Sequence, residues 1–372
     1  MMDAIVIFGA SKNGLRVKRD LESKGLHVKC FCDNNSQKIG NKLDGTDILS
    51  FEKVMEKYGE ALKNIGGGVI IAVNEPDGVM LQIRESTFHI MCYGLSYEYL
   101  HGDRRENFLK QDSIYAIDVN KPRLEYYEYH ISYHCNLKCK GCGHYSNAAP
   151  EEYGDLEKYK KDVARLKELY AGVKRIRLMG GEPLLNPHLA DFCNISRQAF
   201  PDANIRVVTN GLLIPSISIE LLQVMKETCV GFDVTQYPPT SRMKEKIILK
   251  CLENGIDCTI SEPVTQFFSI TNPAGDSDPQ KEFEMCVSRG CHFLENGRMS
   301  VCAVPILNKK YKTMIDERMK VCEEDIINIY EEDLDGFKLN QLLSQPVESC
   351  RFCDNTHKQW FAWCGNFTNF LC

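Results

Sequence analysis

Three closely spaced cysteines are the residues of this sequence with the clearest chemical potential. Cys135, Cys139 and Cys142 form a C-x3-C-x2-C loop directly after a strand-like segment, Tyr126–Tyr133. Three thiolates can hold a cube of four irons and leave one iron without a protein ligand, whereas a structural zinc ion or a ferredoxin cluster takes four ligands. The spacing therefore favours a [4Fe–4S] cluster with one open iron. A zinc loop with a distant fourth ligand is the alternative.

Three more motifs that could contact a bound molecule stand at the ends of the next three predicted strands: Gly180-Gly181-Glu182-Pro183, Thr209-Asn210-Gly211 and Val234-Thr235-Gln236-Tyr237. Paired glycines permit a tight turn close to a ligand, and the Glu182 carboxylate can hold an ammonium group. The C-terminal ends of parallel strands meet at one rim of a barrel. We therefore expect these motifs to share one rim with the cysteine loop.

The strands and helices that would carry these motifs alternate from about residue 113 to residue 280. Asp155–Tyr170 has apolar residues at three- and four-residue intervals, which is the period of an amphipathic helix. After Tyr126–Tyr133, strands are predicted at Arg175–Met179, Ile205–Thr209, Gly231–Thr235 and Cys258–Ile260. Helices are predicted near Leu189–Ala199, Ile219–Thr228 and Arg242–Glu253. This alternation indicates a full or partial β/α barrel.

The cysteine loop and the three motifs, in this order, resemble the radical S-adenosylmethionine (SAM) superfamily over about residues 126–260. The resemblance implies that Cys135, Cys139 and Cys142 hold a [4Fe–4S] cluster whose open iron binds the amino and carboxylate groups of SAM. One electron then cleaves SAM to methionine and a 5′-deoxyadenosyl radical. A radical SAM enzyme is thus the expected activity.

The same resemblance assigns the SAM contacts to Gly180, Gly181, Glu182, Pro183, Thr209, Asn210 and Thr235. Within this set, Glu182 is implied to bind the amino group of SAM. Many members of the superfamily also carry an aromatic residue just before the third cysteine, near the adenine, whereas this chain has Gly141 there. We therefore expect adenine packing from another residue, with Tyr145 and His144 as candidates.

Residues 281–372 break the alternation and are rich in cysteine and glycine turns. Four cysteines follow the pattern C-x10-G-x4-C and then C-x2-C: Cys286, Cys302, Cys350 and Cys353. The pattern resembles the twitch and SPASM extensions of radical SAM enzymes, which implies that these cysteines hold an auxiliary [4Fe–4S] cluster. Cys291 competes with Cys286 for the first position, and a zinc ribbon is the alternative. Glu295-Asn296-Gly297 predicts a hairpin turn.

The first 112 residues predict a parallel, doubly wound sheet, because short apolar strands alternate with helical segments. A turn from Gly9 to Gly14 lies between strand and helix, as in dinucleotide-binding domains, but Ser11 replaces the middle glycine. Asp33 ends the second strand, where an acidic side chain can hold ribose hydroxyls. The segment resembles Rossmann-like domains attached to sugar-modifying and capsule-biosynthesis proteins. Nucleotide binding, nucleotide-sugar binding and a non-binding scaffold all stay open here.

Composition narrows the class of protein and its partners. The chain has 372 residues, a net charge of −6, 43% hydrophobic residues and 26% charged residues, so a phosphate-tracking surface for nucleic acid is not expected. No apolar run approaches the roughly 18 residues of a membrane helix, and the start lacks a secretory signal. Eighteen cysteines without such a signal favour metal or iron–sulfur binding in a reducing cytoplasm.

The sequence thus predicts an α/β protein in three parts: a Rossmann-like domain (1–112), a partial radical SAM barrel (113–280) and a small cysteine-rich α+β extension (281–372). The preferred function is a cytoplasmic radical SAM oxidoreductase or tailoring enzyme that takes hydrogen from a small polar substrate, with a sugar or nucleotide-sugar favoured. Flavodoxin or ferredoxin is the expected reductant. A radical SAM peptide-maturation enzyme, an NAD-dependent dehydrogenase with structural zinc and a non-enzymatic iron–sulfur carrier are the alternatives.

Overall fold

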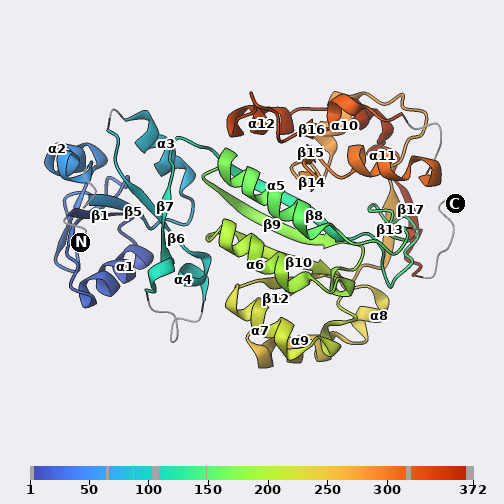
Figure 1. Cartoon of the computed structure of the whole chain (residues 1–372), viewed down its shortest axis with the longest axis horizontal. Coiled ribbons are helices and arrows are strands. Elements are labelled where there is room, and N and C mark those ends of the chain that lie inside the picture. Colours follow the sequence, from blue (N-terminus) through green and yellow to red (C-terminus); the bar gives the residue numbers. More distant parts are fainter. Residues whose placement is uncertain are drawn as a thin grey trace. The chain divides into compact units, whose positions relative to one another are not determined.

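The chain folds into two compact units (Figure 1). A computed structural model describes residues 4–63, 67–86, 88–102, 109–147, 149–315 and 320–365. Unit 1 comprises residues 1–123 with 170–172 and 201–203, and unit 2 comprises 124–169, 173–200 and 204–372. The predicted boundary between residues 280 and 281 falls inside unit 2, so the division into three domains stays a prediction.

Unit 1 is built on a seven-stranded sheet with the order β3-β4-β2-β1-β5-β6-β7. Its strands are β1 (Ala4–Phe8), β2 (Val28–Cys32), β3 (Lys42–Leu43), β4 (Thr46–Leu49), β5 (Gly67–Ile71), β6 (Cys92–Leu95) and β7 (Ile114–Ile117). The strands from β4 to β6 run parallel, as predicted, whereas the edge strands β3 and β7 are antiparallel to their neighbours.

The core of unit 1 lies on both faces of this sheet. Val6 and Phe8 of β1 enter one buried apolar cluster, while Ile5 and Ile7 enter another. Such alternation with both sides buried is typical of a doubly wound sheet. Helices α1 (Lys12–Ser23), α2 (Phe51–Leu62), α3 (Asp77–Glu85) and α4 (Tyr97–His101) complete the unit.

Unit 2 contains an eight-stranded sheet with the order β12-β11-β10-β9-β8-β14-β15-β16. Its strands are β8 (Arg123–Ser132), β9 (Gly172–Gly180), β10 (Asn204–Thr209), β11 (Gly231–Val234), β12 (Cys258–Ile260), β14 (Phe293–Glu295), β15 (Arg298–Ser300) and β16 (Ile327–Asn328). Strands β9 to β12 run parallel. The predicted barrel strands are therefore present, with ends shifted by at most a few residues.

Helices follow these strands along the chain (Figure 1): α5 (Leu156–Leu169), α6 (Leu189–Ala199), α7 (Ile219–Glu227), α8 (Pro238–Ser241) and α9 (Lys244–Asn254). Tyr129 of β8 packs its ring against Tyr159 of α5 and Phe192 of α6. Because side chains alternate along a strand, Glu128 and His130 point to the opposite face of β8, away from these helices. The predicted α/β fold with a partial β/α barrel is confirmed.

The hairpin predicted at Glu295-Asn296-Gly297 is present, with Asn296 and Gly297 at φ 50° and 77° between β14 and β15. Strand β14 also pairs in parallel with β8. The hairpin thus extends the barrel sheet itself, at the strand that leads into the cysteine loop.

The C-terminal part of unit 2 adds α10 (Pro279–Met285), α11 (Val304–Ile315), α12 (Gly336–Leu343) and a two-stranded sheet of β13 (Gln266–Ser269) and β17 (Gln359–Ala362). Short 3₁₀ turns lie at Pro183–Leu185 (η2), Glu323–Asp325 (η4) and Glu348–Phe352 (η5). Among the described residues, no helix combines the length and apolarity that membrane crossing requires.

Candidate cluster and SAM site

The three predicted cluster ligands converge just beyond the end of β8. Cys139 is buried, and Cys135 and Cys142 are half-buried. The pKa of the Cys135 thiol is raised to about 12, chiefly by burial and also by the nearby charges of Glu182, Cys142 and Cys139, against the opposing effect of a hydrogen bond from the Leu137 N–H. The three thiols and the Glu182 carboxylate therefore share one small region.

The donor set of this loop fits an iron–sulfur cube, because three thiolates can hold a [4Fe–4S] cluster and leave one iron open. Two N–H groups also point at sulfur: Leu137 N lies 3.4 Å from Cys135 Sγ, and Trp363 Nε1 lies 3.3 Å from Cys139 Sγ. Such donors stabilise thiolates, so the residues fit a [4Fe–4S] cluster.

The paired glycines after β9 let two backbone segments touch. A Cβ at Gly180 would lie 2.1 Å from the Ser132 carbonyl oxygen, and a Cβ at Gly181 would lie 2.0 Å from the His134 carbonyl oxygen. Because glycine has no Cβ atom, the two segments can approach: the Gly181 N–H donates to Ser132 O at 2.7 Å, and the Glu182 N–H donates to His134 O at 3.0 Å. The predicted SAM-binding turn is thus joined directly to the cysteine loop.

Glu182 lies at the centre of a buried hydrogen-bond network. Its side-chain oxygens accept hydrogen bonds from Thr209 Oγ1 (2.6 Å), Asn210 N (3.0 Å) and Leu184 N (3.0 Å). Burial raises the pKa of Glu182, and these three donors oppose the rise. Asn210 Nδ2 reaches on to Asn136 Oδ1 at 2.7 Å within the cysteine loop. Glu182, Thr209 and Asn210 therefore form one connected site, as the motif positions predict.

The fourth motif contributes a residue that the sequence analysis did not select. Thr235 N donates to Thr209 O at 2.9 Å, which places Thr235 on the predicted rim. Tyr237 lies two residues further on, and burial raises its pKa, with the thiols of Cys139, Cys142 and Cys135 adding to the rise. Tyr237 therefore lies in the neighbourhood of the three cysteines. Its position directly after a barrel strand is the signal that could have identified it.

Gln236 carries an unsatisfied polar atom in the same region. Its Nε2 donates to Ser241 Oγ at 3.0 Å, but its buried Oε1 has no hydrogen-bond partner in the described part of the chain. A buried amide oxygen without a partner costs stability unless a bound group donates to it. This atom therefore indicates that a ligand with hydrogen-bond donors completes the rim.

The two candidates for adenine packing have other partners. His144 Nδ1 lies 2.8 Å from His130 Nε2, and the Tyr145 hydroxyl donates to Asn308 Oδ1 at 3.1 Å. A different aromatic ring lies at the position before the third cysteine. The ring of Phe361 is so close to Gly141 that a Cβ there would come within 2.2 Å of it. Phe361 is 220 positions away in sequence, so no local pattern could have revealed it.

The four predicted auxiliary cysteines also converge. Burial raises the pKa of Cys302 well above its usual value, and the thiols of Cys353, Cys286 and Cys350 add to the rise. The competing Cys291 has partly different neighbours. Burial raises its pKa, Glu128 and Cys286 add to the rise, and two arginines oppose it. Cys302 is thus influenced by the thiols of Cys286, Cys350 and Cys353, and the choice of Cys286 over Cys291 as a ligand stays a prediction.

A polar trio lies beside the cysteine loop, formed by the buried Glu128 and His130 and the half-buried His144. Ligand atoms of these three side chains lie within 4.8 Å of one another. Burial raises the pKa of Glu128 to about 7, although a hydrogen bond from the Tyr126 hydroxyl opposes the rise. His130 is 1% exposed and its Nδ1 has no partner among the described residues. A Cβ at Gly180 would lie 3.2 Å from His130 Cβ, so the trio adjoins the predicted SAM-binding turn.

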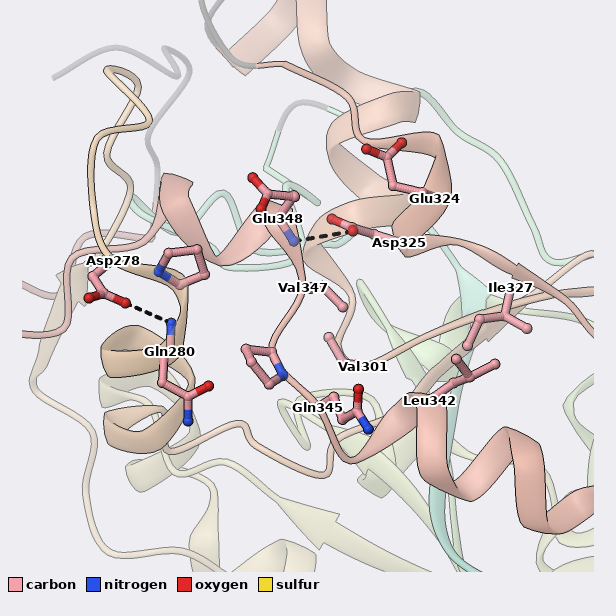
Figure 2. A pocket seen from close by; sticks show the side chains of 12 residues that line it. Asp278, Gln280, Val301, Glu324, Asp325, Ile327, Leu342, Gln345, Val347 and Glu348 are labelled. Atoms are coloured by element: carbon pink, nitrogen blue, oxygen red, sulfur yellow. Dashed lines mark hydrogen bonds between the residues drawn. The ribbon is translucent and has the colours of Figure 1, made fainter.

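A separate cavity of about 450 Å³ lies among α10, η4 and the segment after α12 (Figure 2). Its apolar wall includes Val301 and Leu342, and several acidic side chains surround it. Asp325 accepts hydrogen bonds from Glu348 N and Ser349 N, and Asp278 caps α10. Two of these acids therefore stabilise the local backbone.

In unit 1, the acidic residue predicted to hold a ribose is engaged within the chain. One Asp33 oxygen accepts hydrogen bonds from Ala10 N at 2.9 Å and from Lys38 Nζ at 3.0 Å, and the other accepts from Asn35 N at 2.9 Å. Burial opposes the ionised form, but these donors hold the pKa of Asp33 below its usual value. A ribose would have to displace Lys38 to reach this carboxylate.

Comparisons with known proteins agree with the site. The model of the radical SAM superfamily matches residues 129–260. The chain is 21% identical over 250 residues to GTP 3′,8-cyclase of Nautilia profundicola, covering 64% of this chain and 79% of that protein. It is 24% identical over 150 residues to the GTP 3′,8-cyclase of Campylobacter jejuni subsp. doylei, spanning 38% of this chain and 45% of that relative.

Among solved structures, the crystal structure of BtrN in complex with AdoMet and 2-DOIA covers 63% of this chain and 95% of that chain, with 20% identity and a TM-score of 0.40. The superfamily match spans the cysteine loop and the three strand-end motifs whose side chains form the connected site. Residues 129–260 therefore form a radical SAM domain, and enzymes of this superfamily use a [4Fe–4S] cluster and SAM.

Proposed function

We propose that this enzyme abstracts a hydrogen atom from an unactivated carbon of a small polar substrate, with a sugar or nucleotide-sugar as the substrate class. The polar trio of Glu128, His130 and His144 beside the predicted SAM-binding turn carries the proposal. Two imidazoles and a carboxylate offer both donors and acceptors, which suits hydroxyl groups. A substrate carbon held by its hydroxyls against this trio lies next to the cofactor site.

Each residue of the site has a role in this proposal. Cys135, Cys139 and Cys142 hold the cluster, and Glu182 holds the ammonium group of SAM. When bound, the cluster and SAM supply the one-electron cleavage that yields methionine and a 5′-deoxyadenosyl radical. The residues of the chain bind and orient the reactants and keep water away from them. Gln236 Oε1, which has no partner among the described residues, accepts a hydrogen bond from the bound cofactor or substrate.

We further propose an auxiliary [4Fe–4S] cluster on Cys286, Cys302, Cys350 and Cys353. Four thiolates leave no iron open, which favours electron handling or a structural role over substrate ligation. Tyr145 is near cysteines of both groups: burial raises its pKa, and the thiols of Cys353, Cys302 and Cys142 add to the rise.

The relatives support a nucleotide-bearing substrate over a peptide. These relatives are GTP 3′,8-cyclases, so they act on a nucleotide that contains a sugar. The parallel sheet of unit 1 also differs from the winged-helix module that peptide-maturation enzymes often carry. Membership of the radical SAM superfamily sets aside an NAD-dependent dehydrogenase built on unit 1.

A substrate panel tests the proposal. The anaerobically reconstituted enzyme is supplied with SAM, a reductant and, one at a time, GTP, perdeuterated nucleotide-sugars, free sugars or peptides. We expect a nucleotide or sugar compound to accelerate formation of 5′-deoxyadenosine and to transfer deuterium into it. Glu128→Gln should lose this acceleration and keep substrate-independent SAM cleavage. Acceleration by peptides alone, with full activity in Glu128→Gln, would overturn the proposal.

A further inference from the structure

The end of the described chain lies along the cysteine loop. We call residues Phe361–Gly365 the strap. Its carbonyls bind two N–H groups between the first and third cysteines: Lys140 N donates to Cys364 O at 3.0 Å, and Lys138 N donates to Gly365 O at 2.8 Å. These two backbone hydrogen bonds fix the strap against the cysteine loop.

Trp363 is the strap residue that reaches a cluster ligand. Its indole Nε1–H lies 3.3 Å from Cys139 Sγ, and Cys139 is 7% exposed. The indole ring stacks on Tyr237, with ring centres 5.8 Å apart and an interplanar angle of 18°. The Trp363 backbone is also fixed, since its N–H donates to Thr265 O at 2.9 Å. The donor is therefore held in place from three directions.

Phe361 fixes the other end of the strap. Its ring fills the space above Gly141, where a Cβ would come within 2.2 Å of the ring, and Lys140 Nζ lies 5.2 Å from the ring centre. Strand β17, which carries Phe361, pairs antiparallel with β13. The loop and the strap therefore fit closely along the whole stretch from Cys139 to Gly141.

A hydrogen bond to a cluster thiolate changes the energy of reduction. The reduced cluster carries one more negative charge, which is shared with the sulfur ligands, so an N–H donor stabilises the reduced state more than the oxidised state. We propose that Trp363 is a positioning residue that raises the reduction potential of the SAM-binding cluster through Cys139. The inference rests on the proposed role of Cys139 as a ligand.

The chain provides a matched control for this proposal. It has two tryptophans, and Trp360 is 59% exposed on β17 with its ring against Phe268. Trp363→Phe removes the N–H donor and keeps an aromatic ring, whereas Trp360→Phe makes the same change away from the thiols. Both variants are reconstituted with iron and sulfide, and the SAM-responsive part of the EPR signal is followed in a redox titration.

We expect Trp363→Phe to have the more negative potential. The ratio of reduced to oxidised cluster at a fixed potential should fall about tenfold, which is about 59 mV for a one-electron couple. Trp360→Phe should match the unmodified protein. Equal potentials in the two variants, at equal cluster content, would overturn the proposal.

A second measurement does not depend on the folding of Trp363→Phe. In the Trp360→Phe protein grown with ¹⁵N-indole tryptophan, Trp363 is the one labelled residue. Pulsed EPR of the reduced, SAM-responsive cluster should detect a ¹⁵N coupling, and a clear cluster signal without that coupling would refute the proposed contact. Cys139→Ala separates the two claims: if it retains this cluster, the ligand assignment fails, whatever Trp363 does.

Discussion

Gly181→Ala offers a sharp test of how the SAM-binding turn is held. The added Cβ would lie 2.0 Å from His134 O, 2.4 Å from His134 C and 2.9 Å from Tyr133 O. All three are backbone atoms, so no side chain can move aside to relieve the overlap. The turn from Gly180 to Pro183 must instead shift away from the end of β8.

The shift breaks two backbone hydrogen bonds, from Gly181 N to Ser132 O and from Glu182 N to His134 O. Overpacking costs about 1–3 kcal/mol, and each lost hydrogen bond about 0.5–1.5 kcal/mol. We therefore expect the free energy of unfolding to fall by about 2–6 kcal/mol. Displacement of Glu182 also removes a charge-assisted contact of about 1.5–3 kcal/mol, so SAM should bind about 10- to 150-fold more weakly.

Denaturant unfolding measures the first effect, and equilibrium dialysis of labelled SAM with the reconstituted protein measures the second. Gly143→Ala is the matched control, because a Cβ there meets no atom within 4 Å. Its stability should change by no more than about 0.5 kcal/mol. If Gly181→Ala unfolds like Gly143→Ala and binds SAM with unchanged affinity, the turn does not lie against β8 as described.

Three further predictions concern single side chains. Glu182→Gln should weaken SAM binding about 10- to 150-fold in equilibrium dialysis while the iron content stays constant, and unchanged affinity would remove Glu182 from the SAM site. Burial raises the pKa of Glu128 from 4.5 to about 7, because the folded protein favours the neutral carboxyl. The contribution of this neutral group to the free energy of unfolding is therefore complete below pH 4.5 and is lost as the pH rises through 7. Chemical unfolding from pH 4 to 8 should thus show the native protein losing about 3 kcal/mol relative to Glu128→Gln, and parallel curves would contradict the burial argument. Cys286→Ala should lower bound iron from about eight to about four atoms per chain, whereas Cys291→Ala should not, and the reverse result would exchange their roles.

Local patterns were sufficient to predict the barrel strands and the meeting of the strand-end motifs at one rim. An amphipathic helix such as Asp155–Tyr170 is predictable from the spacing of its apolar residues. Motifs at consecutive strand ends must meet at one rim because the strands are parallel. The network from Glu182 through Thr209 and Asn210 to Asn136 follows from that rule. The hairpin turn at Asn296-Gly297 was equally predictable, since asparagine and glycine both adopt the positive φ that such a turn requires.

Most of the remaining features depend on pairings between distant segments, and one depends on the conformation of a short loop. Trp363 lies 224 residues from Cys139, and Phe361 reaches Gly141 only because β17 pairs with β13. Strand β14 joins the barrel beside β8, although its residues are separated by the whole barrel in sequence. Asp33 has the position of a ribose-binding acid, but the pairing with Lys38 depends on a loop conformation that spacing does not encode.

The central claim is that the loop after β8 holds the cluster at which SAM is cleaved. The most direct test is iron, sulfide and SAM-cleavage analysis of Cys139→Ala beside the unmodified protein, both reconstituted without oxygen. We predict that the unmodified protein forms 5′-deoxyadenosine on reduction and that Cys139→Ala forms none, while its auxiliary iron is retained. SAM cleavage by Cys139→Ala, or an unmodified protein that binds zinc and no iron, would contradict the account.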